Sequence, residues 1–186
     1  MYKHSVVFCP RLKESRKSHG FTQKEVTDEI GTRHVNLSNY ERGEAEPNIE
    51  TLSQLADFYG TSVDYLIGIS SEIPKAKTNK PFYKWNYKDW APDSNWEGKK
   101  NRTACFPKRM KMARARTKLS QKKVADIIGI PASNIAKYEL GQLEPSIETL
   151  ARLCIFYDVR ANWLLGLEDD AGFEDDESKQ EKSSVE

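Results

Sequence analysis

The sequence predicts an all-α protein built from two tandem copies of one small domain. The first observation is an internal repeat. When the chain is shifted by 98 residues, residues 11–68 align with residues 109–166 without an insertion or deletion, and 24 of the 58 positions are identical. The second observation is periodicity, because apolar residues in each copy recur at the three- and four-residue spacing of helices and not with the alternation of strands. A chain of 186 residues has room for two such domains.

The elements of the first copy follow from start and stop signals. Residues 11–18 form the opening helix. Thr22 and Glu25 have the spacing of a capping box, which begins a second helix. Gly31 ends that helix because glycine tolerates the left-handed conformation at a helix end. A third helix follows at about residues 33–41.

The second half of each copy is also helical. Asn48 in the first copy and Ser146 in the second cap an amphipathic helix, which in the first copy covers residues 49–59. A short final turn, "SVDYLIG", ends at Gly68. Each copy is therefore predicted to be a bundle of about five short helices.

The charge is unevenly distributed, although the net charge is only +1. Residues 8–68 carry a net charge of −3 and residues 168–186 carry −7, whereas residues 69–104 carry +4 and residues 105–167 carry +6. A basic surface of this kind indicates binding to nucleic acid.

Several classes of protein are not favoured. No run of about 18 apolar residues is present, so no membrane span is expected. The apolar stretch near the N-terminus, "VVF", is too short for a secretory signal peptide. Cys9, Cys105 and Cys154 have no metal-ligand spacing, which favours reduced structural thiols in the cytoplasm. No catalytic triad, metal cluster or phosphate loop is found, so we expect no enzyme activity, no metal and no cofactor.

Two segments carry a specific resemblance. The sequence "TQKEVTDEIGTRHVNLSNYERG", continued by "PNIETLSQLADFYGTSVDYLIG", resembles the phage Cro and lambda-repressor-type (XRE-like) helix-turn-helix domains, and so does its copy. The resemblance implies two tandem five-helix lambda-repressor-like domains joined by an aromatic-rich linker. It also implies that the second helix of each motif lies in the major groove of double-stranded DNA.

The resemblance carries over to particular residues. It implies that Gln23 and Gln121, at the start of the first motif helix, bond to phosphate or to a base edge. Lys24 and Lys122 beside them are expected to contact phosphate, as are Arg114, Lys118 and Lys123 in the second copy. The recognition helices would present Arg33, His34, Val35, Ser38 and Asn39 in the first copy and Pro131, Ala132, Ser133, Ala136 and Lys137 in the second.

The family likeness also implies a structural role for two acidic residues. Glu41 and Glu139 are expected to form ion pairs with Arg16 and Arg114 beneath the motif. Without the resemblance, both carboxylates would be read as ordinary surface acids.

The two copies differ mainly at outward positions of the recognition helix. The inward positions keep their character, with Leu37 against Ile135 and a tyrosine at position 40 in both copies, whereas outward positions such as Asn39 are exchanged. Two copies with one core and different recognition surfaces are expected to read two different half-sites. Glu44, Glu46 and Glu144 follow the turn glycines, and carboxylates facing phosphates are repulsive. The first copy is therefore open to a second interpretation, as a protein-interaction module.

The predicted boundaries are residues 1–70 and 105–168 for the domains, 71–104 for the linker and 169–186 for the tail. The linker contains "KPFYKWNYKDWAPDSNW", whose aromatic residues could pack against a domain or a second chain, form a short strand, or stack on single-stranded nucleic acid. A flexible linker would span about 33 Å, close to the roughly 34 Å between successive major grooves. The acidic tail is predicted to be disordered, with solubility or competition with DNA as its role.

The leading interpretation is a sequence-specific, double-stranded DNA-binding transcriptional regulator. Repression is favoured because no activation or effector domain is evident, and the resemblance implies a bacterial or phage source. Homodimer formation through the linker or the helix-end surfaces is left open. The alternative is a protein-interaction module on the same scaffold, of the antitoxin or inhibitor kind.

Overall fold

The computed structural model of the chain describes residues 4–71 and 102–168. Every regular element in these two segments is a helix, which confirms the predicted all-α class, and none of these helices is long and apolar enough to cross a membrane. The first repeat contains α1 (His4–Ser18), α2 (Gln23–Ile30), α3 (His34–Arg42), α4 (Ile49–Tyr59) and α5 (Val63–Leu66). The second repeat contains α6 (Arg102–Thr117), α7 (Gln121–Ile128), α8 (Ala132–Leu140), α9 (Ile147–Tyr157) and α10 (Ala161–Leu164). The expectations for most of the linker and for the tail concern residues outside the described segments.

The helix ends of the first repeat lie where the local signals predict them. The Thr22 hydroxyl accepts a hydrogen bond from the Glu25 backbone N–H (3.2 Å), and the Glu25 carboxylate accepts one from the Thr22 N–H (2.7 Å), so the capping box is present. Gly31 ends α2 in the left-handed conformation, with φ of 71°. The Asn48 side chain caps α4 by accepting a hydrogen bond from the Thr51 N–H at 2.8 Å. The positions of α2 and α4 are therefore set by local sequence.

The opening helix is longer than predicted. We expected it to begin at Arg11, but α1 begins at His4 and continues through Pro10. Proline has a φ angle that suits a helix, although it lacks the N–H for one backbone hydrogen bond. Phe8 is only 1% exposed, and burial of this large aromatic side chain stabilises the additional turns. The equivalent Phe106 in α6 is 2% exposed, so the same extension occurs in both repeats.

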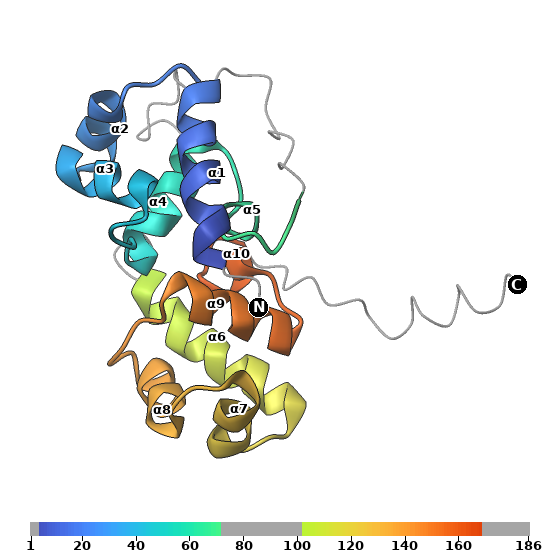
Figure 1. Cartoon of the computed structure of the whole chain (residues 1–186). Helices are drawn as coiled ribbons and strands as arrows, with labels where there is room; N and C mark the ends of the chain where they lie inside the picture. Colours follow the sequence, from blue (N-terminus) through green and yellow to red (C-terminus); the bar gives the residue numbers. More distant parts are fainter. Residues whose placement is uncertain (1–3, 72–101, 169–186) are drawn as a thin grey trace, which may run out of the picture.

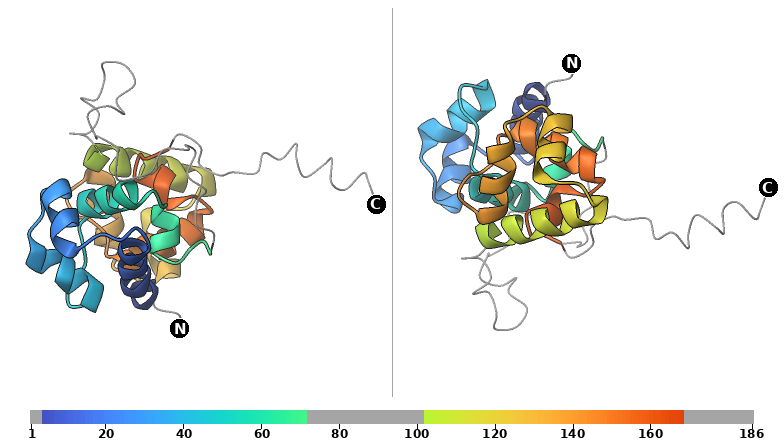
Figure 2. Two further views of the ribbon diagram at one scale, coloured as in Figure 1. Left: turned by 90° about the horizontal axis from the view of Figure 1, so that it is seen from above. Right: turned by 90° about the horizontal axis from the view of Figure 1, so that it is seen from below.

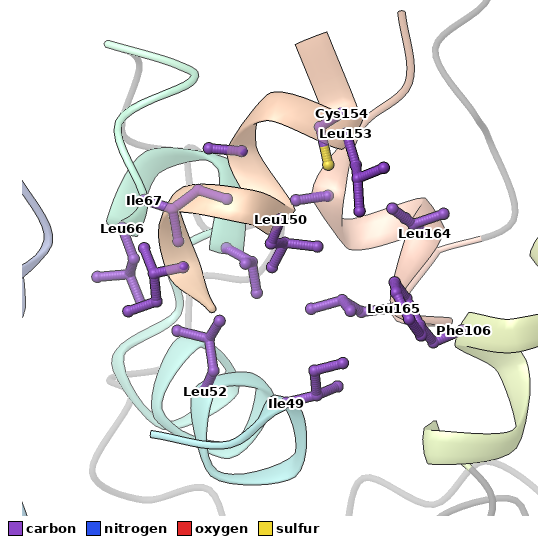
Figure 3. Packing of buried hydrophobic residues seen from close by; sticks show 14 of the residues in the cluster. Ile49, Leu52, Leu66, Ile67, Phe106, Leu150, Leu153, Cys154, Leu164 and Leu165 are labelled. Carbon is purple, nitrogen blue, oxygen red and sulfur yellow. The ribbon is translucent and has the colours of Figure 1, made fainter. Parts of the chain in front are cut away.

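The two repeats pack against each other and share one hydrophobic core. Leu52 of α4 and Leu66 of α5 belong to the same buried cluster as Leu150 of α9 and Leu164 of α10 (Figure 3). Helix α1 also contacts α9, and α4 contacts α6. Either repeat alone would expose part of this core to water, which is unfavourable. The structure is therefore an intramolecular pair of helix-turn-helix units.

The arrangement of the pair is close to two-fold. Helices α2 and α3 lie at one end of the molecule and α7 and α8 at the other, with α4, α5, α9 and α10 between them (Figure 1). The views from above and below place α1 and α6 on opposite sides of the molecule (Figure 2). The recognition helices α3 and α8 both lie on the left-hand side in Figure 1, one in the upper half and one in the lower half.

Candidate nucleic-acid interface

A buried ion pair connects the three helices beneath the first recognition helix. Arg16 of α1 donates from Nε to Glu41 Oε1 (2.5 Å) and from Nη2 to Glu41 Oε2 (2.9 Å), and its Nη1 donates to the Phe21 carbonyl (2.8 Å). Gln23 of α2 donates from Nε2 to Glu41 Oε2 (2.9 Å). The Arg16 and Glu41 side chains are 12% and 3% exposed. The predicted pair is confirmed, and it fixes α3 relative to α1 and α2.

The second repeat contains the same pair. Arg114 donates from Nε to Glu139 Oε1 (2.5 Å) and from Nη2 to Oε2 (3.1 Å), and Gln121 donates from Nε2 to Glu139 Oε2 (2.8 Å). The Glu139 side chain is as well buried as its counterpart, at 2% exposed, but Arg114 is 24% exposed. Water therefore reaches this arginine more easily than it reaches Arg16.

The two glutamines have a second role that the sequence did not indicate. Both were predicted to contact DNA, and each uses one amide N–H to hold the buried glutamate. The other amide N–H and the carbonyl oxygen of Gln23 and Gln121 are the groups that each can offer to phosphate or to a base edge. Contact with DNA stays a prediction for both residues.

The ionised form of the buried glutamates is stabilised by their neighbours. Burial alone would raise the pKa of Glu41 and Glu139, but hydrogen bonds from the arginine and the glutamine outweigh burial, so the pKa of each carboxyl lies below its ordinary value. Burial also raises the pKa of Tyr157 to about 12, with a smaller contribution from the Glu139 carboxylate. Both carboxylates are therefore charged under neutral conditions.

The outer face of α3 carries the predicted recognition residues. Arg33, His34 and Val35 are exposed, while Ser38 and Asn39 are half-buried on the same helix. Val35 is an apolar side chain with 54% of its surface exposed. An exposed β-branched side chain at this position is suited to contact with a thymine methyl group.

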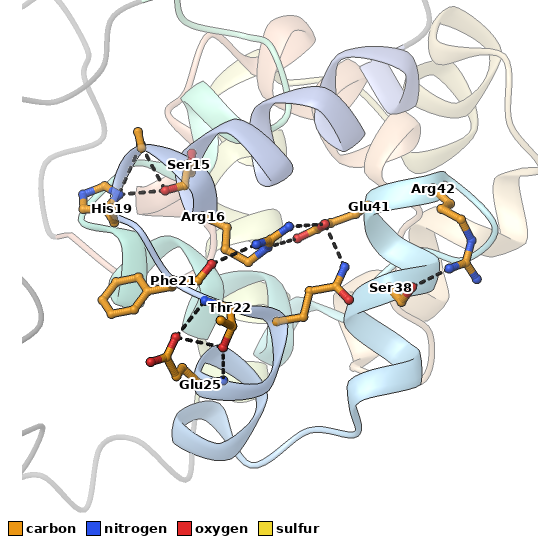
Figure 4. Close-up of polar contacts among 11 residues, drawn as sticks. Ser15, Arg16, His19, Phe21, Thr22, Glu25, Ser38, Glu41 and Arg42 are labelled. Carbon is orange, nitrogen blue, oxygen red and sulfur yellow. Dashed lines mark hydrogen bonds and ion pairs between the residues drawn. The ribbon is translucent and has the colours of Figure 1, made fainter.

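Arg42, which the sequence reasoning missed, connects the polar residues of this face. Its guanidinium donates to the Ser38 hydroxyl (Figure 4) and to Asn39 Oδ1 at 2.6 Å. The same guanidinium binds both carboxylate oxygens of Glu44, at 2.8 and 2.7 Å. Ser38 and Asn39 lie four and three residues before Arg42, so the spacing on one helix face was the signal that could have identified this network.

The outer face of α8 is different. Ala132, Ser133 and Lys137 are exposed and Ala136 is half-buried, so the predicted residues do lie on the outer face. The residue equivalent to Arg42 is Leu140, which is 62% exposed. The residue equivalent to Glu44 is Gln142. The second repeat therefore presents a lysine with no carboxylate at the equivalent loop position.

Three of the lysines expected to contact phosphate lie at the start of the first motif helix, and the fourth, Lys118, lies in the turn before α7. Lys24 in α2 and Lys122 and Lys123 in α7 are exposed, in the first turn of their helices. Glu25 stands in the first repeat where the second has Lys123. The positive charge at this edge is therefore larger in the second repeat.

The acidic residues after the recognition helices have a structural role, which corrects the expectation that they all face phosphates. Glu46 Oε2 accepts a hydrogen bond from the backbone N–H of Ile147 in the other repeat (2.9 Å). Reciprocally, Glu144 Oε2 accepts one from the N–H of Ile49 (3.0 Å). Each carboxylate thus lies at the N-terminus of a helix of the opposite repeat, where the helix dipole favours negative charge. Glu44 is the acid of these loops that pairs with the recognition helix of its own repeat.

The three cysteines form no disulfide bond, and none of them belongs to a possible metal-binding group in the described residues. Cys9 and Cys105 are half-buried and Cys154 is buried. Burial raises the pKa of the Cys154 thiol, with a further contribution from the Asp64 carboxylate. No group of three or more histidine, cysteine, aspartate or glutamate side chains is placed to hold a metal ion in residues 4–71 and 102–168.

Comparison with known proteins agrees with this geometry. A helix-turn-helix family model matches residues 12–66 and again residues 110–164, which together are more than half of the chain. The chain is 42% identical over 69 residues to the HTH-type transcriptional regulator ImmR of Bacillus subtilis, covering 37% of this chain and 54% of that protein.

Two further relatives give the same result. The chain is 31% identical over 96 residues to the HTH-type transcriptional regulator YobD of Bacillus subtilis, covering 50% of this chain and 81% of that protein. It is 40% identical over 58 residues to the cryptic phage CTXphi transcriptional repressor RstR of Vibrio cholerae, covering 31% and 52%. The chain therefore spans about half the length of ImmR and RstR. No solved structure matches.

Proposed function

The chain belongs to the helix-turn-helix family, and we propose that it is a sequence-specific, double-stranded DNA-binding transcriptional regulator, of the repressor type. Relatives with the same motif are named transcriptional regulators, and RstR is named a repressor of a phage. The proposed action is occupation of an operator by the two motifs of one chain.

The observation that carries the proposal is the paired arrangement of two different recognition helices. Helices α3 and α8 lie on one side of the molecule, and the cross-repeat contacts of Glu46 and Glu144 hold their repeats together. A dimeric repressor presents two identical recognition helices to a palindromic operator. Here one chain presents two unlike helices, so its operator is expected to have two unlike half-sites.

The side chains suggest how each half-site is read. Arg33, the N-cap residue of α3, can donate to guanine. Within α3, Asn39 can pair with adenine, and Val35 can contact a thymine methyl group. In α8, Lys137 can donate to guanine, and Ala132 offers a small apolar contact to thymine. The second repeat, with its higher positive charge, supplies most of the attraction to phosphate.

The competing function, a protein-interaction module, loses part of its support. It rests on the acidic residues after the recognition helices, the acidic first repeat and the aromatic linker, and two of those acidic residues, Glu46 and Glu144, form hydrogen bonds between the repeats. Homodimer formation through the helix-end surfaces would compete with the same intramolecular contacts. We therefore propose that one chain is sufficient to occupy one operator.

Binding-site selection with the full chain tests this proposal. Random double-stranded DNA is selected for binding, and the stoichiometry on the selected site is measured by sedimentation. We expect one chain on a site with two dissimilar halves. A perfect inverted repeat occupied by two chains would contradict the proposal, and the absence of any selected sequence would contradict sequence-specific binding.

A further inference from the structure

Equivalent residues of the two repeats face each other at the contact between α5 and α10. Asp64 lies in α5 and Asn162 lies at the same position of α10, 98 residues later. Asp64 Oδ1 accepts a hydrogen bond from the Ala161 N–H (2.7 Å), and Oδ2 accepts one from the Asn162 N–H (3.1 Å). In return, Asn162 Oδ1 accepts one from the Val63 N–H (2.9 Å). Each of the two side chains thus accepts hydrogen bonds from the backbone of the opposite repeat, but only Asp64 is a carboxylate.

Helices α5 and α10 differ in which residues cap their first backbone N–H groups. Helix α5 has its own cap, because the Ser62 hydroxyl accepts a hydrogen bond from the Tyr65 N–H at 3.0 Å. The equivalent residue before α10 is Arg160, which makes no side-chain capping bond. Arginine has no acceptor atom, so it cannot cap the first amides of a helix. Asp64 supplies two acceptor oxygens to α10 from the opposite repeat.

The contact between Asp64 and Asn162 is largely shielded from water, so the charge of each side chain affects its stability. Asp64 is only 8% exposed, and a buried carboxylate without hydrogen-bond donors would be costly. Its two oxygens each receive one backbone N–H in the unlike pair. Asn162 carries no charge, so the contact contains one carboxylate and not two.

We propose that Asp64 and Asn162 make this interface selective for unlike repeats, so that the first repeat pairs with the second and not with its own kind. A pair of first repeats would bring two Asp64 carboxylates into one buried contact, where like charges repel. A pair of second repeats would leave the amides of α10 without a carboxylate, because both repeats have Asn162 and Arg160. Both like pairs are therefore weaker than the unlike pair.

The second cross-repeat contact does not discriminate between these pairings. Glu46 and Glu144 are identical residues at equivalent positions, and each binds the N–H of an isoleucine at the start of the opposite helix. These contacts would form equally well between like repeats. They add strength to the interface, whereas Asp64 and Asn162 add selectivity.

The occupant of the interface is the other repeat of the same chain. Covalent connection gives the second repeat a high effective concentration, so pairing within one chain is favoured over pairing with a second copy. Selectivity for the unlike pair removes the remaining route to self-association through this face. This pairing does not depend on DNA binding.

A set of full-chain variants tests the proposal: Asp64→Asn, Asn162→Asp and the double exchange. Thermal unfolding is measured for each, together with hydrogen exchange of the Ala161 amide. We expect Asp64→Asn to lower the melting temperature by roughly 2–4 °C and to accelerate exchange of the Ala161 amide about tenfold. Asn162→Asp should lower the melting temperature further, because it places two carboxylates in one contact.

The double exchange is the decisive variant. Asp64→Asn is destabilising in the wild-type chain but should be stabilising in the Asn162→Asp background, because it restores one carboxylate and one amide. Failure of the double exchange to exceed Asn162→Asp in melting temperature would overturn the proposal. If the single variant Asn162→Asp does not fold, folding of the double exchange supports the proposal and its failure to fold overturns it.

Two further measurements separate alternative explanations. As a control, Asp28→Asn removes one negative charge from an exposed position of α2. It should change neither the melting temperature nor the exchange rate of the Ala161 amide. If chains paired like with like, Asp64→Asn would remove a repulsive pair and raise the melting temperature, which is opposite to our expectation. Light scattering should give a single-chain mass for the wild type at all concentrations, and a concentration-dependent dimer would contradict pairing within one chain.

Discussion

The two repeats agree in their interior and differ on their recognition surfaces. Both place an arginine and glutamate pair beneath the motif, and Arg16 with Glu41 has nearly the same geometry as Arg114 with Glu139. Of the 58 aligned positions, 24 are identical, but none of the predicted recognition residues of α3 and α8 is among these identities. The two repeats therefore keep the residues that position the helices and differ at exposed positions of the recognition helices.

The recognition surfaces differ in how their charges are compensated. In the first repeat, Arg42 is held by Glu44 and also binds Asn39. In the second repeat, Leu140 and Gln142 replace that ion pair, so Lys137 has no equivalent network. The charge of Arg42 is therefore neutralised within the first repeat, whereas Lys137 of the second repeat is exposed and has no equivalent carboxylate beside it.

Truncation of the buried glutamates, which the two repeats share, should reduce stability more than any other change proposed for the two repeats. Glu41→Ala should lower the free energy of unfolding by about 3 kcal/mol, because it leaves the guanidinium of Arg16 buried without its partner. Glu139→Ala should cost less, because Arg114 is 24% exposed and Arg16 is 12% exposed. Urea unfolding of the two variants measures the difference. An unchanged melting temperature for either variant would refute the role of that pair.

Protonation of the buried glutamates should destabilise the protein less than truncation of their side chains does. The pKa values of Glu41 and Glu139 are lower in the folded protein than the ordinary glutamate value of 4.5. Their stabilising contribution is therefore complete above the unfolded pKa and is lost as the pH falls through the lower folded pKa. We expect the free energy of unfolding to decrease as the pH falls below the ordinary glutamate value of 4.5, and Glu41→Gln to reduce this dependence. If the free energy of unfolding depends on pH in the same way in the wild type and in Glu41→Gln, ionisation of Glu41 does not contribute to stability.

The interior of each repeat could be predicted because its signals are local or periodic. The capping box of Thr22 and Glu25, the stop at Gly31 and the Asn48 cap all act within four residues of the helix end. The start of α1 could not be predicted in the same way. It depends on burial of Phe8 in the folded molecule, and a sequence pattern does not report that contact.

The cross-repeat contacts could not be predicted from the sequence for a related reason. Glu46 reads as a surface acid in a loop, and its partner is the backbone N–H of Ile147, a group that every residue except proline carries. Asp64 and Asn162 likewise bind backbone amides, so no partner side chain marks them. The recognition residues of α3 and α8 were predicted from the family resemblance, and their contacts with DNA stay predictions.

The next prediction concerns the two recognition helices. Asn39→Ala and Lys137→Ala should each weaken binding to the selected operator by roughly 1–3 kcal/mol, because each removes a side chain that can bind a base edge. Asn39→Ala should weaken recognition of the half-site bound by α3, and Lys137→Ala should weaken recognition of the half-site bound by α8. Each variant should therefore become insensitive to base changes in one half of the operator only. Fluorescence anisotropy with operators altered in one half measures this. If Asn39→Ala changes neither affinity nor preference, the first repeat does not read bases.

Substitutions in the loop after the recognition helix should change DNA affinity only slightly. Glu44 neutralises Arg42, and this exposed ion pair is weak in water. Glu44→Gln should release the guanidinium to a phosphate and raise affinity for DNA a few-fold, with about one additional counterion released in the salt dependence. The matched change in the second repeat is Gln142→Glu, which introduces the acid where the chain lacks it.

These two variants act in opposite directions if the comparison between the repeats is correct. Gln142→Glu should lower affinity and make the plot of log affinity against log salt shallower, because a carboxylate near the backbone opposes counterion release. Melting temperatures should stay unchanged, since Glu44 and Gln142 are both exposed. If Gln142→Glu weakens binding and Glu44→Gln has no effect, only α8 approaches the phosphates closely. The acid of the first repeat would then act only within its own network, by holding Arg42 against Asn39.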